Sequence, residues 1–280
     1  MILKRCGLIV PAFRSATHPS RFPVSVQYLG MLREFAGLLG SSALDVLFPQ
    51  ACMLCGEALP GHGTGLCAGC YGRFKKITGP VCTRCGAVFT SSHGGDHVCG
   101  DCIARRTHYD CARSAAVYAG ELRRAIQQFK FNRRSMLAGP LADLVAGSCE
   151  PIGPQRGYAA LVPVPLHPQR LRHRGYNQSL LLALRLGRQW NVPVEREYLR
   201  RTLWSVSQTA LRRSERRRAV RGVFSCRCSR YTGKRLLLID DVFTSGATVD
   251  ECARTLKRNG VAAVDVLTVA RTLKGHPECQ

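Results

Sequence analysis

Acidic residues are scarce in this sequence. Its 280 residues include 18 aspartates and glutamates against 41 lysines and arginines, which gives a formal net charge of +23. A chain this basic attracts polyanions, whether nucleic acid, pyrophosphate compounds or an acidic membrane surface. A basic bias shared by all proteins of one organism would give the same charge, so the charge alone assigns no partner.

Long apolar runs are also lacking. No uninterrupted stretch is long enough to span a bilayer, although the 45% hydrophobic content is enough for a real core. The short apolar patch at residues 8–13 is broken by Pro11 and lacks a convincing small-residue cleavage site, so we do not interpret it as a signal peptide. We therefore expect a cytoplasmic protein without a transmembrane segment.

Two common nucleotide-binding motifs are absent. Gly233-Lys234 is followed by Arg235, and no glycine stands at position 228, so there is no G-x-x-x-x-G-K-[ST] loop of a P-loop NTPase. No predicted strand is followed by G-x-G-x-x-G, which excludes the usual dinucleotide-binding turn.

The most informative stretch that is present is LLLIDDVFTSGAT at residues 236–248. Its apolar run predicts a buried strand of a parallel sheet, and helical spacing of apolar residues follows at once. Asp240 and Asp241 are therefore expected at the carboxyl end of a strand, the edge at which open α/β sheets bind ligands.

The loop after this strand has the composition of a phosphate site. Its residues are Thr244, Ser245, Gly246, Ala247 and Thr248, which offer hydroxyls and free backbone N–H groups at the start of a helix. Two carboxylates beside such a loop suit a sugar phosphate, because the acids accept hydrogen bonds from ribose hydroxyls while the loop holds the 5′-phosphate. The competing interpretation is a helix cap, but a cap needs only one aspartate.

Eight of the fifteen cysteines form four C-x-x-C pairs. Two such pairs make a Cys₄ metal site, so the sequence predicts two structural sites. Sequential or interleaved pairing, and zinc or iron, both remain open at this point. Disulfides are disfavoured in a reducing compartment. The eight predicted ligands are Cys52, Cys55, Cys67, Cys70, Cys82, Cys85, Cys99 and Cys102.

The second half of the chain alternates strand and helix patterns, which predicts a parallel sheet flanked by helices. Strands are expected at residues 115–118, 159–164, 236–241 and 261–270, and helices at 122–130, 137–145, 180–190 and 249–256. Ahead of the cysteines, residues 26–48 have apolar residues at helical spacing and predict a packing helix.

Two basic segments accompany this pattern. The first is a predicted loop after the strand at 159–164, on the same sheet edge as Asp240, and its guanidinium and amide groups suit a pyrophosphate. The second, around residues 212–221, is a substrate-covering flap, a nucleic-acid face or a charged helix flank. The candidate pyrophosphate-side residues are Arg170, Arg172, Arg174, Gly175, Asn177 and Gln178.

Taken together, these motifs resemble the ComF/GntX competence-protein family. LLLIDDVFTSGAT is similar to the ribose-phosphate signature of type I phosphoribosyltransferases, and VPVPLHPQRLRHRGYNQS, SQTALRRSERRRAVRGVF and the C-x-x-C pairs extend the likeness from about residue 45 to 272. The resemblance implies an N-terminal extension at 1–48, a double zinc ribbon at 49–104 and a type I phosphoribosyltransferase-like domain at 112–274.

The same resemblance implies ligands and roles. Phosphoribosyl pyrophosphate (PRPP) would bind with Mg²⁺, with Asp240 and Asp241 on the ribose and residues 244–248 on the 5′-phosphate. Gln208, Arg212 and Arg217 match the family's flexible loop. Two functions remain: a PRPP-binding protein in DNA uptake or utilisation, contacting single-stranded DNA or a DNA-uptake ATPase, and a metabolic phosphoribosyltransferase acting on a base or amine. No general base is identifiable, so whether the chain is an enzyme stays open.

Overall fold

A computed structural model describes residues 51–59, 65–89, 94–148, 150–203 and 218–273. The helix predicted over residues 26–48 lies outside this part, as do Gln208, Arg212 and Arg217. The chain from Gln50 to Gln280 forms one compact unit.

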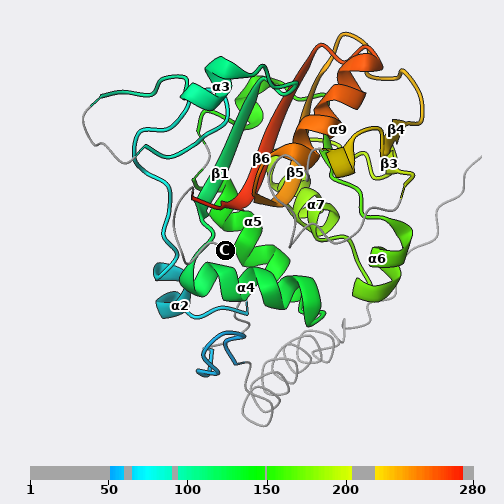
Figure 1. Cartoon of the computed structure of the whole chain (residues 1–280). Helices are drawn as coiled ribbons and strands as arrows, with labels where there is room; N and C mark the ends of the chain where they lie inside the picture. Colours follow the sequence, from blue (N-terminus) through cyan, green and yellow to red (C-terminus); the bar gives the residue numbers. More distant parts are fainter. Residues whose placement is uncertain (1–50, 60–64, 90–93, 149, 204–217, 274–280) are drawn as a thin grey trace, which may run out of the picture. The chain divides into compact units, whose positions relative to one another are not determined.

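A four-stranded sheet lies at the centre of this unit (Figure 1). Its order is β1 (Cys111–Val117), β6 (Ala263–Arg271), β5 (Arg235–Phe243) and β2 (Ala160–Pro163), and every neighbouring pair is parallel. The predicted parallel sheet is therefore confirmed, and the four strands expected from the sequence are those observed.

Three helices cover one face of the sheet. They are α4 (Gly120–Phe131), α5 (Ala138–Ala146, after a 3₁₀ turn at Ser135–Leu137) and α7 (Gln178–Trp190). Their apolar residues share a core with alternate residues of β5, among them Leu237 and Ile239. This alternation is expected of a strand buried on both faces, since successive side chains point to opposite sides.

Helix α9 (Ala247–Arg258) covers the opposite face. Its buried residues pack with Leu236 and Leu238, the other set along β5. An antiparallel pair of short strands, β3 (Leu199–Arg201) and β4 (Phe224–Cys226), lies beside it, with β4 in contact with α9. The apolar spacing that predicted this helix is confirmed, because Val249, Cys252, Ala253 and Leu256 are all buried.

The cysteine-rich segment packs against the sheet domain. It contains two short helices, α2 (Ala68–Gly72) and α3 (Gly100–Ala104), and otherwise consists of turns and isolated bridges. Leu54, Leu66 and Phe74 belong to the same buried core as α4 and α5. The segment thus gains apolar burial from its neighbour that its own short length could not supply.

One prediction was wrong. Residues 168–174, expected as part of a loop, form the short helix α6 (Pro168–Arg174). Pro168 occupies its first turn and Gly175 ends it with a φ of 83°, so both ordinary helix-boundary signals are present in the sequence.

Among the described helices, none has the length and apolar character needed to cross a bilayer.

Candidate functional site

The candidate site lies where β5 and β2 run side by side. Strand β5 is followed by α9. Strand β2 is followed, after α6, by α7, which packs against it. Helices α9 and α7 cover opposite faces of the sheet. Neighbouring parallel strands whose helices leave on opposite faces create a crevice at their carboxyl ends, the place where open α/β sheets bind ligands. Asp240 and Asp241 lie at this edge of the sheet.

Strand β5 runs further than the sequence suggested. It continues through both aspartates to Phe243, and Asp240 pairs in register with Thr268 of β6. On the other side the ladder ends at Pro163, opposite Ile239. The aspartates therefore follow the last paired residue on the β2 side, where no neighbouring strand encloses them. Neither caps a helix, because the N-cap of α9 is Gly246.

Asp240 is held by two hydrogen bonds. Its Oδ1 accepts from the Ser179 hydroxyl at 2.9 Å and from the backbone N–H of Asp241 at 3.0 Å. Burial, followed by the negative charge of Asp241, raises the pKa of Asp240 to about 7, although Lys130 and these hydrogen bonds oppose the rise. A carboxyl of this kind changes its charge near neutral pH.

We expect Asp240→Asn to stabilise the protein at neutral and alkaline pH. An unfolded aspartate loses its proton near pH 3.8, whereas the folded state holds it up to about pH 7. The ionisation penalty is therefore absent below about pH 4, grows as the pH rises to about 7 and is constant above that. The gain should be on the order of 1–3 kcal/mol at pH 8 and should shrink toward pH 5. Paired urea unfolding curves measure it, and a difference that does not change with pH would contradict the assignment.

Asp241 forms an ion pair with a lysine of the helix predicted at residues 122–130. Lys130, in the last turn of α4, lies with its Nζ 2.9 Å from Asp241 Oδ1, and both side chains are largely buried. Sequence reasoning missed Lys130 and Ser179, as it did Arg201 on β3, which is described below. Ser179 had one usable signal, since it stands in the first turn of a helix that opens at the sheet edge already assigned to the ligand.

The loop at residues 244–248 opens α9 as predicted. Gly246 has a φ of 73°, and a Cβ at this position would lie 2.6 Å from Cζ of Phe243. Only glycine fits this turn, because the backbone is left-handed and the phenyl ring occupies the side-chain position. The first turn of α9 consequently presents its backbone N–H groups away from the helix, the arrangement that binds anions.

The predicted pyrophosphate-side residues divide into two groups. Asn177 and Gln178 serve the framework: Asn177 caps α7 and donates to the carbonyl of Val164, while Gln178 accepts from Arg174 at 3.2 Å and donates to the carbonyl of Lys130. The second group is cationic and lies on or near α6, and its charges are close enough to interact.

Two of these predicted arginines, Arg170 and Arg174, form a cationic cluster with Arg201, which was not predicted. Burial and the nearby Arg174 lower the pKa of Arg170, and burial and the nearby Arg170 lower the pKa of Arg201 on β3. Like charges that depress one another favour an anion between them. Arg172 is exposed, and no contact between described residues joins it to Asp240 or Asp241.

The cysteines form two groups of four in sequential pairs. One group is Cys52, Cys55, Cys67 and Cys70, the other Cys82, Cys85, Cys99 and Cys102, and in each the sulfurs lie within 4.8 Å of one another. Interleaved pairing is thereby excluded. Two of the sulfur separations are 3.6 Å (Cys55–Cys67) and 3.7 Å (Cys85–Cys99). A tetrahedral zinc ion with Zn–S bonds of about 2.3 Å requires about 3.8 Å, so both groups fit zinc.

In each cysteine group the backbone favours the thiolate of one residue, whereas burial raises the pKa of others such as Cys70 and Cys102. Burial raises the pKa of Cys82, but N–H groups of Cys85 and Cys99 donate to its sulfur and lower the pKa to about 6. Cys52 has the same balance, with N–H groups of Cys55 and Cys67 and a pKa of about 6. Thiolates, not thiols, bind zinc, so these hydrogen bonds favour the metal-bound state.

The second cysteine group is linked to the phosphate loop through Arg271. This buried arginine at the end of β6 donates from Nη1 to the carbonyl of Cys85 at 2.7 Å, and its guanidinium lies 5.0 Å from the ring centroid of Phe243. The ring of Phe243 in turn packs against Gly246 of the phosphate loop. The metal group, the arginine, the phenyl ring and the loop thus form one packed series.

Several known proteins are similar to this chain in sequence. A family model described as a double zinc ribbon domain matches residues 43–103. The DNA utilization protein YhgH of Escherichia coli K12 is 34% identical over 230 residues, which cover 80% of this chain and 98% of that protein. The chain belongs to the ComF/GntX competence-protein family. Competence protein F of Haemophilus influenzae is 30% identical with the same coverage.

The predicted architecture is confirmed to the extent that an N-terminal double zinc ribbon precedes a parallel sheet flanked by helices. The two Cys₄ groups are its zinc sites. Among solved structures, a purine phosphoribosyltransferase from Pyrococcus horikoshii covers 48% of this chain and 81% of its own, with 11% identity and a TM-score of 0.30.

Proposed function

We propose that this ComF-family protein binds PRPP at the edge of β5 and acts in DNA uptake or utilisation. The observation that supports binding is the placement of two carboxylates and a helix-opening phosphate loop at a switch point of a parallel sheet. The role in DNA handling follows the name of the E. coli relative, a DNA utilization protein.

Each part of the site has a role in this proposal. The ribose hydroxyls would donate to Asp240 and Asp241, whose orientation is already fixed by Ser179 and Lys130. The 5′-phosphate would accept from the N–H groups of residues 245–248. The pyrophosphate would lie toward Lys130 and the arginine cluster of Arg170, Arg174 and Arg201, which stabilise negative charge.

The donor set also fits magnesium. Asp240 and Asp241 supply carboxylate oxygens, the ligand type that Mg²⁺ prefers. When bound together with PRPP, Mg²⁺ supplies neutralisation of the pyrophosphate charge. The arrangement would equally serve a phosphoribosyltransferase, and pyrophosphate release in the presence of candidate bases or amines separates that activity from binding alone.

Calorimetric titration with PRPP and Mg²⁺ tests the proposal. We expect binding by the zinc-loaded wild type and a loss of about 30-fold or more in affinity for Asp241→Asn, because charge-assisted hydrogen bonds contribute about 1.5–3 kcal/mol each. Asp143→Asn is the matched control, since Asp143 is an exposed aspartate on α5 that contacts Gln189. A well-folded wild type that binds no PRPP would refute the proposal, as would equal affinity in Asp241→Asn.

A further inference from the structure

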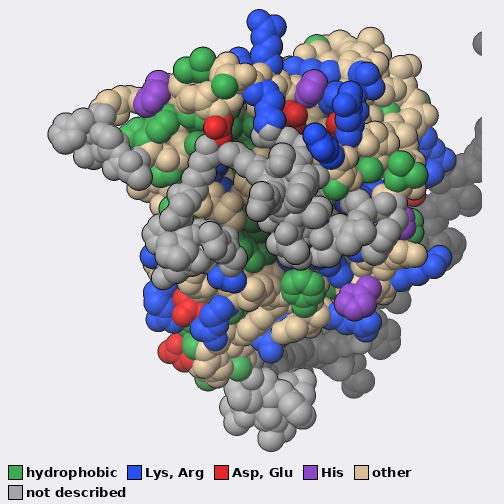
Figure 2. Space-filling model, in the orientation of Figure 1, with side chains coloured by type: hydrophobic (Ala, Val, Ile, Leu, Met, Phe, Trp, Pro, Cys, Tyr) green, Lys and Arg blue, Asp and Glu red, His purple; other side chains and the backbone are tan. Residues whose placement is uncertain are grey.

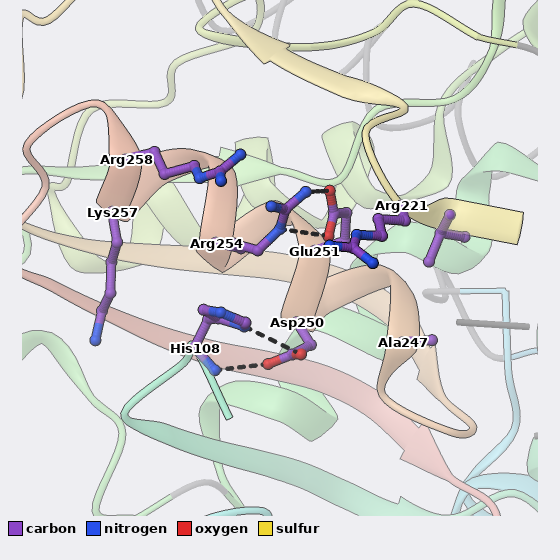
Figure 3. Close-up of a pocket in the computed structure, with 9 residues that line it drawn as sticks. His108, Arg221, Ala247, Asp250, Glu251, Arg254, Lys257 and Arg258 are labelled. Atoms are coloured by element: carbon purple, nitrogen blue, oxygen red, sulfur yellow. Dashed lines mark hydrogen bonds and ion pairs between the residues drawn. The ribbon is translucent and has the colours of Figure 1, made fainter. Parts of the chain in front are cut away.

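A hollow lined mostly by basic side chains lies on the outer side of α9. Its volume is about 660 Å³, and Figure 3 shows the side chains that line it. Most of them come from the last three turns of α9, joined by His108 and by the turn at residues 220–221. One end reaches Ala247, so the hollow adjoins the first turn of α9 but lies on the opposite face of the sheet from Lys130 and Ser179.

Cations outnumber anions in this lining. Arg221, Arg254, Lys257 and Arg258 face two carboxylates, Asp250 and Glu251. In Figure 2, lysine and arginine side chains gather on the upper part of the face shown, over the region of α9, with few acidic side chains among them. The lining therefore keeps a positive charge that no group within it cancels.

Both carboxylates are engaged in holding the wall together. Glu251 is buried and accepts from Arg254 Nε at 2.8 Å and from the backbone N–H of Gly222 at 2.7 Å. Burial raises the pKa of Glu251, but these hydrogen bonds outweigh it and lower the pKa. Asp250 accepts from the backbone N–H and the Nδ1 of His108 at 2.6 and 3.3 Å, as Figure 3 shows. The acidic groups position the basic ones and the 220–222 turn.

Two arginines of the lining, unlike Arg254, are not hydrogen-bonded to either of these carboxylates. The side chains of Arg221 and Arg258 are exposed and make no hydrogen bond or ion pair with any residue that the structure describes. An arginine on a convex surface is simply solvated. Here Arg221 and Arg258 share one hollow with Arg254, which is paired with Glu251, and Lys257, which is paired with Asp110. A phosphate group would relieve the repulsion of the two remaining guanidiniums.

The lining also indicates what kind of phosphate ligand fits. Among the described residues that line the hollow there is no Phe, Tyr or Trp on which a nucleobase could stack, and the ring of His108 is held by Asp250. Three of its cations, Arg254, Lys257 and Arg258, lie within little more than one turn of α9, and Arg221 joins them from a separate segment. The hollow they line has a volume of about 660 Å³, more than one phosphate group fills, which suits successive phosphodiesters better than a single phosphate. Contacts of this kind hold the backbone without reading its sequence.

We propose that the α9 hollow, formed by Arg221, Arg254, Lys257 and Arg258 with His108, binds the phosphodiester backbone of single-stranded nucleic acid independently of base sequence. The choice of ligand rests on the proposed role in DNA utilisation. The hollow meets the candidate PRPP site at Ala247, but its four cations are not among the residues assigned to PRPP.

Fluorescence anisotropy with a labelled 20-nucleotide oligodeoxythymidine tests this inference. The variant Arg221→Gln/Arg258→Gln removes only the two unengaged cations and so spares the wall. We expect its Kd to rise at least about 5-fold and its log–log salt slope to fall by about 1.4, the value for two phosphate contacts on a single strand. A mixed-sequence strand of the same length should bind the wild type with similar affinity.

The matched control is Arg185→Gln/Arg188→Gln, two exposed arginines on α7, which covers the other face of the sheet. An equal loss in both double variants would show that net charge alone attracts the strand and would overturn the proposal. Displacement of the strand by millimolar inorganic phosphate would overturn the polymeric ligand. PRPP titration of the Arg221/Arg258 variant should match the wild type. Strand binding without PRPP binding would refute only the proposed function.

Discussion

Removal of both zinc ions should unfold the cysteine-rich ribbons and lower the thermal transition of the protein by more than about 10 °C. Structural zinc contributes apparent free energies of about 10–16 kcal/mol in small ribbons, so losing two ions exceeds the stability of an ordinary domain segment. The effect should extend beyond the ribbons, because Leu54, Leu66 and Phe74 share a buried core with α4 and α5. Calorimetry before and after chelation measures it.

The zinc count and one variant make this prediction sharper. The native protein should release two zinc equivalents, and Cys70→Ser should release one and unfold at a lower temperature. Cys228→Ser is the control, because Cys228 is exposed and belongs to neither Cys₄ group. An iron-containing protein, or an unchanged transition after complete metal loss, would contradict the expectation.

Gly246→Ala should destabilise the protein by about 2–5 kcal/mol and abolish PRPP binding. A left-handed residue with a Cβ costs about 1–2 kcal/mol, and overpacking against a buried ring adds about 1–3 kcal/mol. The new Cβ would lie 2.6 Å from Cζ of Phe243. Relief of that contact requires movement of the turn that carries the N–H groups of the phosphate loop. Denaturant unfolding and PRPP titration measure the two effects.

Gly233→Ala separates the two causes. Gly233 has nearly the same φ, 71°, but a Cβ there would meet nothing within 4 Å. It should cost only the backbone strain and leave PRPP affinity unchanged. Phe243→Leu combined with Gly246→Ala should recover part of the lost stability. Equal destabilisation by the two alanines would show that the contact with Phe243 has no energetic weight.

Local sequence patterns were enough to predict the individual strands and most helices, and the cysteine pairs that bind metal. The apolar run at residues 236–239 specifies a buried strand in any parallel sheet, and the C-x-x-C spacing brings two sulfurs together without help from the rest of the chain. Helix α6 was missed because its charged residues suggested a ligand-binding loop, although Pro168 and Gly175 mark its ends.

The rest of the candidate site depends on contacts between distant segments. Lys130 is 111 residues before Asp241, and its position on α4 gives no sign that the last turn of this helix reaches the sheet edge. The α9 hollow is equally non-local, since His108 and Asp250 meet across 142 positions. Helical periodicity identifies which side of α9 is exposed, but not which loops build a wall around that side.

The hydrogen bond from Arg271 to the carbonyl of Cys85 places a buried guanidinium beside the second cysteine group. Four thiolates and one divalent cation leave a net charge of −2 on each centre, so two loaded centres lower the formal charge of the chain from +23 to about +19. Arg271 is buried, and no carboxylate in the described part of the chain pairs with it. The thiolates of a zinc-loaded centre would therefore be its counter-ion, and the ring that supports the phosphate loop lies against that guanidinium.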